Sequence, residues 1–322
     1  MKSVFVTGAN GLLGTNLVLM LVEQGFAVKA LVRRKDSFIK FHHTNLKLIE
    51  GDLQNTDLLI NEIMGCQYVA HIAANTSQGL LKLADYYSAN IQGTQNIIDA
   101  CKVNRIEKLV YISTANIFSS GDPIQPSNEN SPMNYPFSKM LYVKSKKRAQ
   151  DLIDKASEEL NITSICPSFM LGEYDTKPSS GKIILMALNK RLVFYPTGGK
   201  SFVHVKDVPQ GIINAFNQKQ SGQKYILSNE NLSYKKFYSK LINQTHQKTT
   251  LIPIPNLVLL MIGLTGEILR FFRVQTDLSF LNLKALTVRN YFSNHKAKQE
   301  LKIQFTPIDE AIKDAVDYFE KS

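Results

Sequence analysis

The 322-residue chain predicts an α/β protein built on a doubly wound parallel sheet, with a smaller, mixed and mainly helical C-terminal cap for a substrate. The first observation behind this prediction is an apolar strand, a glycine-rich turn and a helix at the N-terminus. The second is a regular alternation of short apolar runs with helical patterns up to about residue 165. The third is the loss of this alternation further on, where turn residues become frequent. With 44% hydrophobic residues, the chain can bury one such core and a smaller second unit.

The N-terminal segment predicts a dinucleotide site. Residues 3–6 form an apolar run typical of a buried strand, and apolar residues recur at helical spacing from 12 to 22. Of the glycines between them, Gly8 would permit the tight turn, Gly11 the approach of a pyrophosphate, and Gly14 the close packing of helix and strand. The N–H groups at the helix start would then hold the phosphates. The expected cofactor contacts in this segment are Gly8, Asn10, Gly11, Leu12, Leu13 and Gly14.

The end of the next strand bears on which cofactor is used. Residues 27–32 are followed by Arg33, Arg34 and Lys35. An acidic residue at this point would accept hydrogen bonds from the adenosine ribose of NAD, whereas arginine pairs with the 2′-phosphate of NADP. We therefore expect Arg33 to favour NADP, and NAD stays open as the alternative because Asp36 follows closely.

Two further strand ends should contribute to the same groove. Asp52 and Leu53 follow a third apolar run at 46–49, in a position suited to contact adenine. The fourth run begins at Tyr68 and leads into Ala73 and Ala74, small residues where the cofactor would pass.

Tyr135 and Lys139 stand four residues apart, and Thr114 lies 21 residues before the tyrosine. A phenol and an ammonium at i and i+4 fall on one face of a helix, close enough for the cation to favour the phenolate. Because a free tyrosine titrates near ~10, acid–base work near pH 7 needs such help. Pro136 would be tolerated in the first turn of that helix, where its missing N–H has no partner. The pattern predicts a redox enzyme, and the alternative is an exposed helix with an unrelated Tyr and Lys.

With these residues in hand, the chain resembles the extended short-chain dehydrogenase/reductase family over nearly its whole length. The likeness rests on TGANGLLG at 7–14, GDL at 51–53, HIAA at 71–74, NIQGTQN at 90–96, KLVYIST at 108–114, YPFSK at 135–139, CPS at 166–168 and SFVHVKDV at 201–208. The resemblance implies a Rossmann domain and hydride transfer between nicotinamide and a substrate carbon. It assigns the substrate hydrogen bond to Thr114, with Ser113 left open, the proton transfer to Tyr135 and the nicotinamide ribose to Lys139. It also implies cofactor contacts from Asn90, Tyr135, Lys139, Pro167 and Met170.

The resemblance also narrows the reaction. Dehydratases of this family carry acidic residues directly after the Ser/Thr position, where this chain has Ala115 and Asn116. Epimerases usually show Arg-Pro-x-Asn after the sixth strand, whereas this chain reads Cys-Pro-Ser-Phe at 166–169. The apolar version is similar to the dihydroflavonol reductase and 3β-hydroxysteroid dehydrogenase branch. It implies an NADP-preferring carbonyl reductase or alcohol dehydrogenase for a steroid-, flavonoid- or lipid-like substrate. A nucleotide-sugar epimerase or reductase is the alternative, and a cofactor-binding regulator without catalysis is a third hypothesis that the intact Tyr/Lys pair disfavours.

For domain organisation, we expect a Rossmann domain at 1–166 with a returning segment at about 200–228. Residues 167–199 and 229–322 would form the cap, with the last helix packing back on the Rossmann domain. Within the returning segment, residues 202–205 are expected to form a strand of the first domain. Asp207 and Gln210 should form a capping box for a helix through about Asn217.

Charge and cysteine usage limit the partners. The net charge is +11, but the basic run at 144–148 lacks interleaved aromatic residues and is typical of a solvated helix face. We therefore expect a small-molecule substrate and no nucleic acid. The three cysteines are widely spaced in apolar contexts, and the six histidines lack metal-ligand spacing, so no disulfide framework and no metal site is indicated. The expected compartment is the cytoplasm, and a homodimer is left open.

No apolar run reaches ~18 residues, so we expect no transmembrane segment. Apolar residues do recur at helical spacing late in the chain, and the ordinary explanation is a cap helix packing this face inward. The alternative is that part of the face lines an apolar pocket or rests weakly on a membrane surface, with Arg270 and Arg273 toward anionic headgroups. This apolar stripe consists of Leu257, Leu260, Met261, Leu264, Ile268, Phe271 and Phe272.

Overall fold

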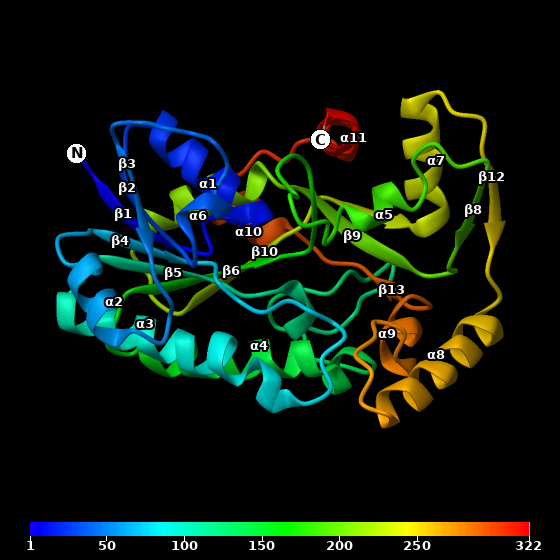
Figure 1. Ribbon diagram of the computed structural model, residues 1–322, viewed down its shortest axis with the longest axis horizontal. Helices are drawn as coiled ribbons and strands as arrows, with labels where there is room; N and C mark the ends of the chain where they lie inside the picture. Colours follow the sequence, from blue (N-terminus) through cyan, green and yellow to red (C-terminus); the bar gives the residue numbers. More distant parts are fainter. Residues whose placement is uncertain (322) are drawn as a thin grey trace.

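The computed structural model describes residues 1–321 and confirms the doubly wound parallel sheet (Figure 1). Its seven strands run in the order β10-β6-β5-β4-β1-β2-β3, and each neighbouring pair is parallel. The strands are β1 (Ser3–Thr7), β2 (Ala27–Val32), β3 (Leu46–Glu50), β4 (Tyr68–His71), β5 (Lys108–Ile112), β6 (Ile162–Pro167) and β10 (Gln223–Leu227). The strand order reverses between β1 and β4, and ligands of such sheets bind at the carboxyl edge near this point.

Helices cover both faces of the sheet because successive side chains of a buried strand point to opposite faces. Val4 and Val6 of β1 belong to the core on one face, and Phe5 belongs to the core on the other. The first face is covered by α1 (Leu12–Glu23), α6 (Asp207–Phe216) and α10 (His295–Glu300). The second is covered by α2 (Thr56–Ile63), α3 (Gly93–Asn104) and α4 (Leu141–Ala156).

The cap lies beyond one end of the main sheet and has two small sheets of its own (Figure 1). The larger contains β7 (Phe169–Leu171), β9 (Gly199–His204), β11 (Glu230–Ser233) and β13 (Arg289–Asn290), and the smaller pairs β8 (Leu192–Tyr195) with β12 (Thr250–Pro253). The cap helices are α5 (Lys182–Leu185), α7 (Tyr234–Thr245), α8 (Asn256–Phe271), α9 (Phe280–Ala285) and α11 (Ile308–Lys321). Short 3-10 helices occur at η1 (Lys35–Ser37), η2 (Leu83–Tyr86), η4 (Ala115–Ile117) and η5 (Phe137–Lys139), and η3 (Tyr87–Gln92) is a π-helix.

The structure corrects three expectations about the second half of the chain. The predicted strand at 202–205 is β9, which pairs in the cap sheet, and it is β10 that returns to the main sheet beside β6. Asp207 does not cap α6, because its carboxylate instead accepts hydrogen bonds from the Thr306 N–H at 3.0 Å and the Thr306 hydroxyl at 2.7 Å.

The third correction concerns the last helix. The apolar face of α11, which includes Ile308 and Ile312, packs in the cap core with Phe202 and Phe237 rather than on the Rossmann domain. The C-terminal segment that does pack on the main sheet is α10 and the residues just after it. Within residues 1–321, no helix combines the length and the apolar character needed to cross a bilayer.

Candidate active site

The glycine turn between β1 and α1 has the shape that a bound dinucleotide requires. Gly8 has a φ of +68°, and a Cβ there would lie 2.8 Å from the backbone nitrogen of Ala73. A Cβ at Gly14 would lie only 2.0 Å from the Gly8 carbonyl oxygen. At Gly11, by contrast, a Cβ would meet only that oxygen, at 3.5 Å. No side chain caps α1, which begins at Leu12, so the N–H groups of its first turn fit the phosphates of a dinucleotide.

The segment after β2 leaves one arginine unengaged. Arg34 pairs with Asp36 at 3.4 Å, so the acidic residue that could have served a ribose already has a cationic partner. Arg33 is exposed and has no ion-pair partner in the described chain, residues 1–321. Asn10 donates a hydrogen bond to the Ser37 hydroxyl at 2.9 Å, which ties the glycine turn to this segment.

The other predicted cofactor residues fall into two groups. Ala73 and Ala74 are half-buried beyond β4, and Asp52 is exposed beyond β3, so all three lie at the carboxyl edge of the sheet. Leu53 is instead part of the core on the α2–α3 face of the sheet.

Asn90 has a supporting role in the structure. It is buried, accepts a hydrogen bond from the Asn75 N–H at 2.6 Å and donates one to the Ser145 hydroxyl at 2.8 Å. It therefore joins the loop after β4 to α4. Pro167 ends β6 and is buried, and Met170 is half-buried in β7.

The structure does not place Tyr135 and Lys139 on one helix face. Tyr135 precedes the short helix η5, its peptide bond to Pro136 is cis, and its side chain is 50% exposed. Lys139 ends η5 and is exposed, and α4 begins only at Leu141. Thr114, by contrast, is buried just beyond β5, as a site residue at the sheet edge would be.

A second tyrosine–lysine pair with the same spacing meets Thr114. Tyr142 and Lys146 lie in the first turns of α4, and a hydrogen bond joins Tyr142 to Thr114. Burial raises the pKa of Tyr142 to about 12, and this hydrogen bond opposes the rise. The arrangement places a phenol beside a buried hydroxyl at the carboxyl end of β5.

Lys146 is held firmly in the same cluster. Its side chain is 3% exposed, its Nζ donates a hydrogen bond to the Ile112 carbonyl at 2.7 Å and lies 4.4 Å from the centre of the Tyr111 ring. Burial lowers the pKa of Lys146 to about 7. A phenol, a hydroxyl and a buried amine in one cluster can move a proton at a bound oxygen atom.

The sequence prediction missed Tyr142 and Lys146, although a signal for them was present. Val143, Ala149 and Ile153 are buried and continue at helical spacing along the face that carries the pair. This apolar face shows that α4 turns Tyr142 and Lys146 toward the sheet.

The cap brings a further cation toward the cluster. Asn290 donates to the Asn116 side-chain oxygen at 2.8 Å, and the Asn116 N–H donates to the Thr114 hydroxyl at 3.3 Å. Asn290 pairs with Lys200 in the β13–β9 ladder, and the Lys200 Nζ lies 4.5 Å from the centre of the Phe169 ring. Burial lowers the pKa of Lys200 to about 8, and no acidic side chain of residues 1–321 pairs with it. Its sequence position gave no sign of this role, which depends on the pairing of β9 with β13.

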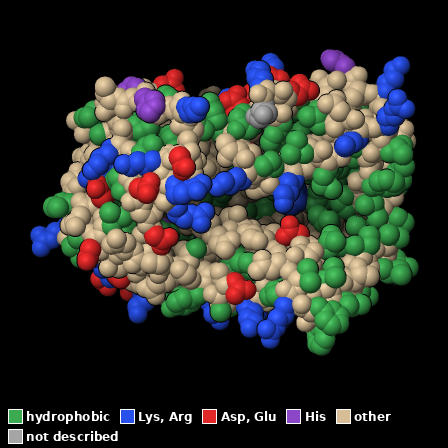
Figure 2. Space-filling view, in the orientation of Figure 1, with side chains coloured by type: hydrophobic (Ala, Val, Ile, Leu, Met, Phe, Trp, Pro, Cys, Tyr) green, Lys and Arg blue, Asp and Glu red, His purple; other side chains and the backbone are tan. Residues whose placement is uncertain are grey.

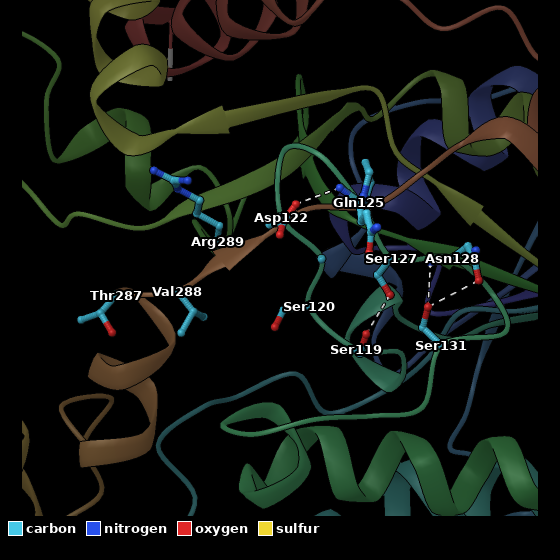
Figure 3. Close-up of a pocket in the computed structure, with 12 residues that line it drawn as sticks. Ser119, Ser120, Asp122, Gln125, Ser127, Asn128, Ser131, Thr287, Val288 and Arg289 are labelled. Atoms are coloured by element: carbon cyan, nitrogen blue, oxygen red, sulfur yellow. Dashed lines mark hydrogen bonds between the residues drawn. The ribbon is translucent and has the colours of Figure 1, made fainter.

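A polar pocket of about 750 Å³ lies beside this region, between the loop at 119–131 and the cap residues 287–289 (Figure 3). Asp122 lines the pocket from the loop, and Arg289 lines it from the cap side. Since serine, asparagine and glutamine side chains contribute much of the lining, this pocket does not suit the steroid-, flavonoid- or lipid-like substrate that the resemblance implies. In the described chain, no group of three His, Cys, Asp or Glu side chains is placed to hold a metal ion.

Comparisons with known proteins identify relatives over most of the chain. The model of the NAD dependent epimerase/dehydratase family matches residues 4–229. A relative from Synechocystis sp., provisionally named dihydroflavonol 4-reductase, is 31% identical over 98% of this chain and 94% of its own. A 4-hydroxy-2-methyl-3-oxo-4-farnesyl-3,4-dihydroquinoline-1-oxide ketoreductase from Stigmatella aurantiaca is 30% identical over 70% of this chain and 67% of its own. The sterol demethylase protein B of Methylococcus capsulatus is 25% identical over 98% and 97%.

Solved structures share the whole architecture. The crystal structure of gox2253 matches with a TM-score of 0.84 and 26% identity, covering 100% of this chain and 98% of that one. A UDP-glucose 4-epimerase from Thermotoga maritima, solved with UDP-glucose, has a TM-score of 0.80 at 17% identity, with 99% of each chain covered. At that identity the epimerase shows the fold alone.

Proposed function

Because the chain belongs to the NAD-dependent epimerase/dehydratase family, we propose that it is an NAD(P)-dependent oxidoreductase acting on a carbonyl or alcohol group of a largely apolar substrate. The observation that carries this proposal is the cluster of Thr114, Tyr142 and Lys146 at the carboxyl end of β5. The reductase and ketoreductase names of two relatives support the reaction type. The farnesylated quinoline in the name of the second supports an apolar substrate.

The bound nicotinamide would supply or accept the hydride. The turn from Gly8 to Gly14 and the first N–H groups of α1 would hold the phosphates. Tyr142 would give a proton to the substrate oxygen, or take one from it, while the Thr114 hydroxyl hydrogen-bonds the same oxygen. Lys146, in place of Lys139, would bind the nicotinamide ribose and favour the phenolate of Tyr142.

The proposal includes a preference for NADP. Arg33 is exposed at the end of β2 and carries no ion pair with any residue of 1–321, so its guanidinium is available to a 2′-phosphate. Asp36, the acid that follows β2 most closely in the sequence, is paired with Arg34 at 3.4 Å, and Glu50 of β3 accepts a hydrogen bond from the Lys35 N–H at 2.9 Å.

The second candidate function is a nucleotide-sugar epimerase or reductase, and Lys200 is the observation that favours it. Lys200, which pairs with Asn290 in the β9–β13 ladder and has no acidic partner among residues 1–321, could pair with an anionic group of a substrate. The neighbouring Phe169 ring favours the apolar substrate, because it would pack against a hydrophobic group.

The experiment is oxidation of NADPH and NADH with a panel of hydrophobic ketones and aldehydes, with isomerisation of UDP- and GDP-sugars measured alongside. We expect turnover of hydrophobic carbonyls and none of the sugar nucleotides. Lys200→Met separates the two functions, because a neutral ketone should be reduced within a few-fold of the wild-type rate. Sugar-nucleotide isomerisation that is lost in Lys200→Met would replace the first function by the second.

A further inference from the structure

The apolar stripe predicted at 257–272 lies on α8. It does not pack against the cap, as it would if the stripe were simply the buried face of a cap helix. α8 meets the rest of the cap through a narrow strip of buried residues, Leu259, Gly263 and Gly266. The glycines allow the close contact, since a Cβ at Gly266 would lie 1.6 Å from the Leu278 carbonyl oxygen. The opposite side of the helix is formed by Leu257, Met261, Leu264 and Ile268, whose exposed fractions lie between 56% and 70%.

The outward side of α8 also carries no charged side chain. The helix has two charged residues, and both turn back toward the protein. Glu267 accepts a hydrogen bond from the Phe280 N–H at 2.8 Å. Arg270 donates to the carbonyls of Gly79 at 3.3 Å and Leu80 at 3.0 Å. What remains on the surface is therefore uncharged and mostly apolar, since the exposed Thr265 donates its hydroxyl to the Ile262 carbonyl at 2.8 Å. The surface ends in Phe271, which is 82% exposed.

The exposed apolar surface continues onto the neighbouring sheet. Leu192 and Phe194 of β8 are exposed, and so is Met186 just after α5. Figure 2 shows hydrophobic side chains gathered at this end of the molecule, over α8, β8 and β12. Such a continuous exposed surface is uncommon in a monomer and marks a contact site.

We propose that α8 is a docking face for an anionic lipid bilayer, formed by Leu257, Met261, Leu264, Ile268, Phe271 and Phe272. Its 16 residues span about 24 Å at about 1.5 Å per residue, which suits a helix lying in the plane of the headgroups. Because α8 is buried only along one narrow strip, acyl chains can surround most of its circumference, whereas a flat protein surface would contact only its outermost side chains.

Charge decides in favour of an anionic membrane. The chain has a net charge of +11, and residues 177–291 contain only four acidic residues, Asp207, Glu230, Glu267 and Asp277. Arg273 follows the two phenylalanines directly and is exposed. Basic residues beside an inserted apolar face add attraction to anionic headgroups.

The docking face is connected to the candidate active site. The Arg270 hydrogen bonds and a further bond from the Asn282 side chain to the Gln78 carbonyl, at 3.2 Å, fix α8 and α9 to the loop after β4. That loop leaves the carboxyl edge of the sheet, where the cofactor would pass. If the proposed function holds, an apolar substrate dissolved in the bilayer would reach the site from this side.

The test is co-sedimentation of the full chain with vesicles of phosphatidylcholine alone and of phosphatidylcholine mixed with phosphatidylglycerol. We expect binding to the mixed vesicles that weakens with salt. Ile268→Glu should lower vesicle affinity at least about tenfold, because it places a carboxylate in the inserted face. Val103→Glu is the matched control, since Val103 on α3 is 62% exposed but remote from α8, and it should bind like the wild type.

Arg273→Glu should lose affinity for mixed vesicles and not for phosphatidylcholine alone. Absence of sedimentation with both vesicle types, or equal effects of Ile268→Glu and Val103→Glu, would overturn the proposal. The main rival explanation is that α8 is the interface of a dimer, and sedimentation velocity on the same proteins tests it. A dimer that dissociates in Ile268→Glu would show that this face binds a second copy of the chain. Vesicle binding is measured without cofactor or substrate, so its outcome is independent of the proposed reaction.

Discussion

Tyr142→Phe is the substitution that examines the candidate site most closely. It removes the hydroxyl that bonds to Thr114 and keeps the ring, so packing around α4 should be preserved. Loss of a positioned proton donor costs roughly 10²–10⁴ in turnover, or about 2.7–5.5 kcal/mol in the barrier. The structure adds a second magnitude. Burial raises the pKa of Tyr142 from 10.0 to about 12, so the free protein holds this phenol protonated near pH 7, as a proton donor to a substrate oxygen must be.

Tyr135→Phe is the matched control, because Tyr135 has the same spacing to a lysine but is half-exposed outside α4. Its turnover should stay within about twofold of the wild type, since it contributes no proton in this account. The assay is steady-state turnover of NADPH with the best hydrophobic ketone, together with NADPH affinity from cofactor fluorescence. Both variants should bind NADPH nearly as the wild type does. A large loss in Tyr135→Phe with full activity in Tyr142→Phe would refute the reasoning.

Three further predictions follow from the cofactor groove and the core. Arg33→Ala should weaken NADPH binding at least about tenfold, or ~1.4 kcal/mol, and leave NADH binding unchanged; equal losses for both cofactors in titrations would show that Arg33 does not contact the 2′-phosphate. Gly14→Ala should lower the melting temperature because its Cβ would meet the Gly8 carbonyl, whereas Gly11→Ala should keep the fold and weaken only cofactor binding. Burial lowers the pKa of His71 to about 3. Between pH ~6.5 and pH ~3 the imidazole is therefore neutral in the folded protein, whereas it takes up a proton in the unfolded chain. The free energy of unfolding should therefore fall by about 1.4 kcal/mol for each unit by which the pH is lowered through this window, and the His71→Asn variant, unfolded in urea, should lack this contribution.

The Rossmann half could be predicted from the sequence because its signals are local. An apolar run predicts a strand such as β1. Glycine is required at positions 8 and 14 because backbone atoms approach closely there. Neither signal depends on distant parts of the chain. The glycine turn and the doubly wound parallel sheet therefore agree with the structure.

The tyrosine–lysine pair could not be chosen by spacing, because two pairs in succession have the same spacing. Which pair faces the sheet depends on where α4 begins, at Leu141, and on the apolar residues that fix its buried side. Tyr135 precedes that start, so its spacing to Lys139 has no helical meaning.

The ordinary explanation of the apolar stripe on α8, inward packing, was wrong for a related reason. Periodicity shows that one side of a helix is apolar, but not which side packs. Here the packing side is the one with Gly263 and Gly266, whose small size permits close contact and adds nothing to a hydrophobic pattern. The large apolar side chains of α8 therefore lie on the outer surface.

The most direct test of the central claim follows the hydride itself. NADPH carrying deuterium at both hydrogen positions of nicotinamide C4 is incubated with the enzyme and a hydrophobic ketone, and the product is analysed by mass spectrometry. We predict one deuterium on the carbinol carbon for each NADPH oxidised, a transfer kept in Tyr135→Phe and lost in Tyr142→Phe. Isomerisation of a sugar nucleotide without net NADPH oxidation, and no deuterium in any alcohol, would contradict the account.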